Sequence, residues 1–132
     1  MCFSFNYLLR CQNVTGNIAV NGKERNMKTF RQISRYIMQQ DIVQSMLTVQ
    51  EVMTYAADLK LGFNETTTAQ KVEIIDEVLL LLRLNSVVYT PCMLLSGGEL
   101  KRLSIAMELV NNPPVLFLDE VFVNMFKLSL QF

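Results

Sequence analysis

Two glycines at the start of a predicted helix mark the part of this sequence best suited to bind an anion. Ser96 and Glu99, in the run Leu95-Ser-Gly-Gly-Glu99, have the spacing of a capping box, in which a hydroxyl and a carboxylate satisfy free N–H groups of the first turn. The cap does not explain Gly97 and Gly98, because each glycine in a helix costs about 0.5–1 kcal/mol relative to alanine. Free N–H groups and the positive end of the helix dipole favour close approach of a phosphate there.

A pair of acids after a predicted buried strand is the second chemical signal. Val115-Leu-Phe-Leu118 is continuously apolar and is followed at once by Asp119 and Glu120, which is typical of a strand buried on both faces of a parallel sheet. Ligands of such sheets bind beyond the carboxyl ends of the strands. The pair therefore predicts that Asp119 holds Mg²⁺, directly or through water, and that Glu120 orients or deprotonates an attacking water. The alternative is two solvated acids at a strand end.

The composition excludes several other chemistries. The 132 residues include no histidine, which excludes a Ser-His or Cys-His nucleophilic pair and a histidine-ligated metal. Twelve basic and twelve acidic side chains give a formal net charge of zero, so there is no long-range field to attract nucleic acid. Three cysteines without paired short spacing are typical of a reducing compartment. With 51% hydrophobic and 18% charged residues, the chain is expected to cover apolar surface with a partner.

Three helices are predicted to position these residues. Thr48-Val-Gln-Glu51 is a capping box before apolar residues at helical spacing, which predicts a helix over 48–60. A second amphipathic helix is predicted to follow the polar loop 62–68 and to end near Leu84. The third begins after Ser96 and ends at the Asn-Asn-Pro-Pro run 111–114, because proline stops a helix.

Strands are predicted before and after the helices. The β-prone runs 16–22 and 32–38 precede them, and 115–118 follows the third helix. No apolar stretch approaches the roughly 20 residues that a membrane span requires. The solvated face of the second helix is expected to carry its charged residues, namely Lys71, Glu73, Asp76 and Glu77.

Taken as one block, residues 95–120 (LSGGELKRLSIAMELVNNPPVLFLDE) resemble the signature helix and Walker B strand of ATP-binding cassette (ABC) transporters. The likeness is greatest to subfamily G, the white-type half-transporters whose nucleotide domain precedes the membrane domain. It extends upstream through 14–41, similar to the β-subdomain and Q-loop, and through 47–61, similar to the start of the helical subdomain. The four segments follow the family's order and make the resemblance specific.

The resemblance implies a role for each matched residue in binding and hydrolysing ATP with Mg²⁺. Ser96, Gly97 and Gly98, in a nucleotide-binding motif that Glu99 completes, would contact the γ-phosphate of ATP held by the opposite subunit of a head-to-tail dimer. Gln39 matches the Q-loop glutamine that senses Mg²⁺ and the attacking water, although Gln40 is adjacent and leaves the register open. Asp119 would be the Walker B metal ligand, and Glu120 the catalytic base.

The sequence also departs from the family's pattern. It contains no G-x-x-x-x-G-K-[ST] phosphate-binding loop (Walker A), and residues 121–132 match neither the family's segment after Walker B nor its switch histidine. The expected fold class is therefore α/β, a partial P-loop NTPase fold with an intact helical subdomain and an incomplete core sheet. Its expected divisions are 13–47 (β-subdomain and Q-loop region), 48–110 (helical subdomain with the signature motif), 111–120 (Walker B strand) and 121–132 (unmatched tail).

The function expected from the resemblance is that of an ATP-hydrolysing domain, in truncated form, at the cytosolic face of a membrane. In the complete family member this domain couples ATP hydrolysis to export of lipids, sterols or other small molecules. Its partners would be a second nucleotide-binding domain and a transmembrane domain, and the present chain is expected to be inactive alone. One alternative is a non-catalytic protein that docks on an intact half-transporter through its signature motif. Another is a small helical protein in which the motif is only a cap.

Overall fold

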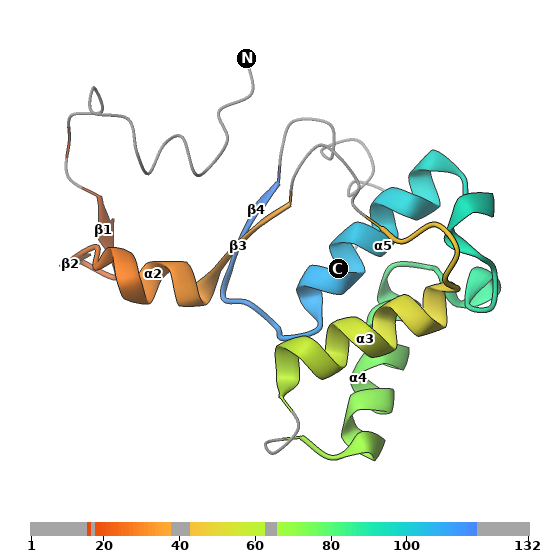
Figure 1. The fold of residues 1–132 in the computed structure, drawn as a ribbon. Helices are drawn as coiled ribbons and strands as arrows, with labels where there is room; N and C mark the ends of the chain where they lie inside the picture. Colours follow the sequence, from red (N-terminus) through yellow and green to blue (C-terminus); the bar gives the residue numbers. More distant parts are fainter. Residues whose placement is uncertain (1–15, 17, 38–42, 63–65, 119–132) are drawn as a thin grey trace.

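The computed structural model of the chain describes residues 16, 18–37, 43–62 and 66–118. Within this part, a short parallel sheet lies between a hairpin with one short helix and a group of three longer helices (Figure 1). In chain order the elements are β1 (Ala19–Val20), β2 (Lys23–Glu24), α2 (Met27–Ile33), β3 (Ser34–Ile37), α3 (Val49–Leu61), α4 (Thr68–Leu81), the 3₁₀ turns η1 (Asn85–Val87) and η2 (Cys92–Leu94), α5 (Gly97–Leu109) and β4 (Val115–Leu118).

The predicted strand at 16–22 is one arm of a tight hairpin. Ala19 pairs with Glu24 and Val20 with Lys23, which leaves a two-residue turn of Asn21 and Gly22. Both turn residues have positive φ, 51° and 76°, as a type I′ turn requires. The sequence Gly22-Lys23 is therefore a hairpin turn followed by a strand, and it does not form a phosphate-binding loop.

The parallel pairing predicted for the apolar run 115–118 is present, but residues 115–117 are half-buried rather than buried on both faces, because β3 and β4 form a sheet of only two strands within the described residues. β3 and β4 pair in parallel, with Ser34 opposite Val115 and Ile37 opposite Leu118. Both strands consequently end at the same edge of the sheet. In the sequence, Gln39 follows the end of β3, and Asp119 with Glu120 follows the end of β4; all three lie outside the described residues.

The second predicted strand begins two residues later than expected because a helix precedes it. The side chain of Asn26 accepts hydrogen bonds from the N–H groups of Lys28 and Thr29, which caps the start of α2. At its end, the Ser34 hydroxyl donates to the Phe30 carbonyl at 2.7 Å. Residues 32 and 33 are therefore the last turn of α2, and the strand starts at Ser34.

All three predicted longer helices form, and α3, α4 and α5 pack on one another around a shared apolar core. The capping box at Thr48 is complete: the Thr48 N–H and hydroxyl donate to Glu51 Oε2 at 2.8 and 2.7 Å, and the Thr48 hydroxyl oxygen accepts from the Glu51 N–H. The core residues include Val49, Met53, Ile75, Leu79, Leu82, Leu84, Leu103 and Ile105. Among the described residues, none of the helices is long and apolar enough to cross a bilayer.

One residue of α4 is more buried than the sequence predicts. Lys71, expected on the solvated face, is only 7% exposed, and its ammonium group contacts Asp58 Oδ1 of α3 at 2.8 Å. The ion pair explains the difference, since a lysine is buried only when an acid compensates its charge. Glu73, Asp76 and Glu77 are exposed, as predicted.

Candidate functional site

The start of α5 has the cap that the sequence predicts. The Ser96 N–H donates to Glu99 Oε2 at 2.8 Å, and the Ser96 hydroxyl donates to the same oxygen at 2.5 Å. The hydroxyl oxygen also accepts a hydrogen bond from the Glu99 N–H at 3.3 Å. Ser96 is exposed and Glu99 half-buried, so the box forms at the surface of the molecule.

The two glycines that follow have backbone donors that are free among the described residues; Gly97 is exposed and Gly98 is half-buried. Gly97 and Gly98 occupy the first turn of α5, and their N–H groups have no hydrogen-bond partner within the described part of the chain. A Cβ added at Gly97 would meet no atom within 4 Å there, so packing does not require a glycine at this position. Unpaired N–H groups at a helix start suit an anion from outside the chain.

Glu99 brings a negative charge to this helix start. Hydrogen bonds from the Ser96 side chain, then from the Ser96 backbone, and to a smaller extent the charge of Arg102, lower the pKa of Glu99. The carboxylate is therefore ionised at neutral pH. The Ser96 hydroxyl donates to this carboxylate.

Arg102, one turn further along α5, is a feature that the sequence reading did not single out. Its Nε atom is buried and lacks a hydrogen-bond partner among the described residues. Its charge lowers the pKa of Glu99, so it adds positive potential to the end of the helix that carries the glycines. The sequence signal for this feature is the spacing of Arg102, which comes three residues after Glu99. Side chains at positions i and i+3 share a helix face.

The segment before Ser96 is held by the segment before α3. The Cys92 N–H donates to the Leu47 carbonyl at 2.8 Å, and the Met93 N–H donates to the Ser45 carbonyl at 2.9 Å. Cys92 itself is buried, and burial raises the pKa of its thiol, which makes it a packing residue rather than a nucleophile. These bonds place the starts of α3 and α5 beside each other.

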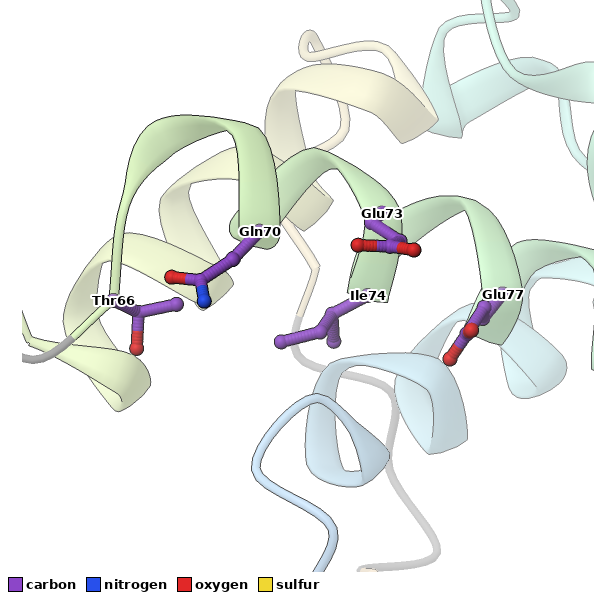
Figure 2. Close-up of a pocket in the computed structure, with 5 residues that line it drawn as sticks. All are labelled: Thr66, Gln70, Glu73, Ile74 and Glu77. Carbon is purple, nitrogen blue, oxygen red and sulfur yellow. The ribbon is translucent and has the colours of Figure 1, made fainter.

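A concave surface lies along α4. It has a volume of about 300 Å³ and is lined by Thr66, Gln70, Glu73, Ile74 and Glu77 (Figure 2). Gln70 is already engaged in a capping box with Thr67, and none of residues 96–99 lines the surface. Among the described residues, no group of three or more acids, cysteines or histidines is arranged to hold a metal.

The depressed pKa of Glu99 predicts an acid-sensitive contribution to stability. The folded-state pKa lies below the unfolded value of about 4.3, so the contribution is present above pH 4.3 and is lost as the pH falls through the folded-state pKa. Glu99→Gln keeps a carbonyl acceptor for Ser96, as Gln70 does for Thr67. We expect the melting temperature of the wild type to exceed that of this variant at pH 7. The gap between the two melting temperatures should shrink toward pH 3 in circular-dichroism melts. A gap that stays constant with pH would contradict the assignment.

Comparison with known proteins places the chain in a family. Residues 5–123 match the ABC transporter family. The chain is 38% identical over 110 residues to ABC transporter G family member 31 of Arabidopsis thaliana, with 80% of this chain and 8% of the relative covered. It is 38% identical over 116 residues to ABC transporter G family member 42 of Oryza sativa subsp. japonica, with 81% and 8% covered.

A third relative has the same subfamily name and a shorter chain. ABC transporter G family member 17 of Arabidopsis thaliana is 35% identical over 112 residues, which cover 82% of this chain and 17% of the relative. The chain thus spans less than a fifth of the length of each of these three relatives. The family match covers most of the chain and includes α5 with its two glycines. The chain therefore belongs to the ABC transporter family, as a nucleotide-binding domain of subfamily G with a P-loop NTPase fold.

Proposed function

We propose that this chain supplies the signature-motif half of an ATP site to a second ABC nucleotide-binding domain. In this proposal the Ser96 hydroxyl and the N–H groups of Gly97 and Gly98 bind the γ-phosphate of ATP that the second domain holds. The observation that supports it is the start of α5: Ser96 and Gly97 are exposed, Gly98 is half-buried, and the N–H groups of both glycines have no partner among the described residues. Charge-assisted bonds from such donors to a phosphate are short and strong.

The other half of the chemistry is assigned to residues that follow β3 and β4. We assign Gln39 to sensing Mg²⁺ and the attacking water, Asp119 to holding Mg²⁺, and Glu120 to general-base catalysis. Support comes from the parallel register, because Ile37 lies opposite Leu118 and both strands end at one edge of the sheet. In parallel sheets that edge is where ligands bind. Mg²⁺, when bound there, would offset the charge of the phosphates.

The organisation of the chain follows from this assignment. In this proposal residues 13–47 form the β-subdomain and Q-loop region, 48–110 the helical subdomain and 111–120 the Walker B strand; the family match itself runs to residue 123, so 124–132 lie beyond it. The sequence has no Walker A loop, so the core sheet is incomplete and the phosphates lack their backbone cradle. The purified 132 residues are therefore expected to show no Mg²⁺-ATP turnover. Turnover that Glu120→Gln abolishes would contradict this expectation.

In the whole transporter, the domain is proposed to couple ATP hydrolysis to export of lipids, sterols or other small molecules. The proposed partners are a second nucleotide-binding domain and a transmembrane domain, and the proposed location is the cytosolic face of a membrane. These assignments come from the subfamily to which the chain belongs.

The decisive experiment measures association with a complete subfamily G nucleotide-binding domain. The domain of ABC transporter G family member 17 is a suitable partner. Binding of the labelled 132-residue chain to it is titrated with Mg²⁺-ATP, with Mg²⁺-ADP and without nucleotide. Tight binding only with ATP supports the proposal, and equal binding in all three conditions contradicts it. ATP-dependent binding that leaves the partner's hydrolysis unchanged would favour the alternative of a non-catalytic docking protein.

A further inference from the structure

Glu108 lies near the C-terminal end of α5, whereas the two glycines lie at its N-terminal end. Its carboxylate lies between two cations from other elements. Its Oε1 atom contacts Lys60 Nζ of α3 at 2.8 Å, and its Oε2 atom lies 3.9 Å from Arg35 Nε of β3. The three side chains are partly buried, with exposures of 23% for Lys60 and 28% each for Glu108 and Arg35. One carboxylate thus joins three elements that are distant in sequence.

Arg35 extends this network to α2. Its Nη1 atom donates to the carbonyls of Arg31, Gln32 and Ser34 at 3.3, 3.2 and 3.0 Å. The Asn111 amide, assigned in the orientation that satisfies both of its ends, accepts from Arg35 Nη2 at 2.9 Å and donates to the Glu108 carbonyl at 3.1 Å. The guanidinium therefore binds the end of α2 on one side and the end of α5 on the other.

Lys60 supplies the positive charge that the last turn of α5 lacks. The last turn of α5 contains no basic residue, although a cation there would be favoured by the helix dipole. Lys60 fills this role from α3, since its ammonium donates to the Met107 carbonyl at 2.8 Å as well as pairing with Glu108. The end of α5 is consequently held by charges from two neighbouring elements.

We propose that Glu108 is a positioning residue: through Arg35 and Lys60 it sets the direction of α5 relative to the β3–β4 pair, and so places Ser96 and Gly97 for phosphate contact. This inference rests on the proposed function. The 13 residues of α5 span about 20 Å, so a small change in helix direction at the Glu108 end displaces the Ser96 end by a larger distance. A tilt of about 10° at the held end would move the opposite end by about 3 Å, and catalytic contacts are sensitive to a misplacement of about 1 Å.

The test compares two variants in each of which an acidic side chain is replaced by its amide. Glu108→Gln leaves Arg35 and Lys60 without their shared carboxylate, whereas the control Asp58→Asn breaks the Lys71–Asp58 pair, which joins α3 to α4. Both variants are expected to lower the melting temperature. Only Glu108→Gln is expected to weaken ATP-dependent association with the partner nucleotide-binding domain, by about fivefold. Asp58→Asn should stay within about twofold of wild type.

Amide hydrogen exchange gives a second readout that needs no nucleotide. Loss of the tie between α5 and β3 should speed exchange in β3, at residues 35–37, by about fivefold in Glu108→Gln and not in Asp58→Asn. Equal effects of both variants on association would overturn the inference and leave only a contribution to stability. An unchanged exchange rate at residues 35–37 in Glu108→Gln would also overturn the inference. This result would count even if the wild-type chain binds no partner. Absence of ATP-dependent binding by wild type itself would instead refute the proposed function.

Discussion

Ser96→Asp is expected to abolish ATP-dependent association with a complete subfamily G nucleotide-binding domain while the chain remains folded. Aspartate caps a helix about as well as serine, so α5 should still form. A carboxylate in place of the Ser96 hydroxyl, which now hydrogen-bonds Glu99, would oppose a phosphate at close range. Two like charges about 4 Å apart near a protein surface cost several kcal/mol. The dissociation constant, measured by fluorescence anisotropy, should rise by about 100-fold or more.

The matched control for this variant is Thr48→Asp. Thr48 caps α3 with the same type of box, and its partner Glu51 has the same spacing. The control introduces the same acid beside a glutamate but at another helix, so it should melt like Ser96→Asp and bind like wild type. If Ser96→Asp also binds like wild type, the motif is only a cap and the phosphate role is wrong.

Leu103→Ala is expected to produce the largest loss of stability among substitutions in α5. Leu103 has 0% exposure and lies in the core shared by α3, α4 and α5. Replacing a fully buried leucine by alanine removes apolar burial and leaves a cavity, at a cost of about 2–5 kcal/mol. Since single domains are stable by only about 5–15 kcal/mol, the urea midpoint should fall steeply.

Leu59→Ala provides the comparison at an exposed site. Leu59 is a leucine of α3 with 83% exposure, and its replacement should change the unfolding free energy by no more than about 0.5 kcal/mol. A small effect at Leu103 together with a large one at Leu59 would mean that the helices pack through other faces. Urea unfolding followed by circular dichroism measures both variants under one condition.

The helices and their starts were predictable because their signals are local. A hydroxyl and a carboxylate three residues apart begin α3 and α5, and both boxes are present with the expected hydrogen bonds. The parallel strand 115–118 was also predictable, because a continuous apolar run before two acids has few other readings. For the same reason the capping box at Ser96–Glu99 was predictable, whereas binding of an anion there stays a prediction.

Other features depend on contacts between residues far apart in the chain. Lys71 has the sequence surroundings of a solvated lysine, and its burial follows from Asp58 on a neighbouring helix. The burial of Lys71 therefore depends on a partner that no local pattern indicates. The short helix α2 is a different case: it includes two residues of the expected strand because Asn26 and Ser34 cap its ends through contacts with residues two to four positions away.

The residue types and spacings of this sequence were sufficient for the family, the three long helices and the candidate phosphate contacts, because all of these are encoded in short segments. The shared edge of β3 and β4 and the joining of Arg35, Glu108 and Lys60 arise only on folding. No local pattern pairs residue 35 with residue 108, since an ion pair needs proximity in space and the strands and helices supply it. The physical reason is that pairing register and helix packing bring these charges within 4 Å.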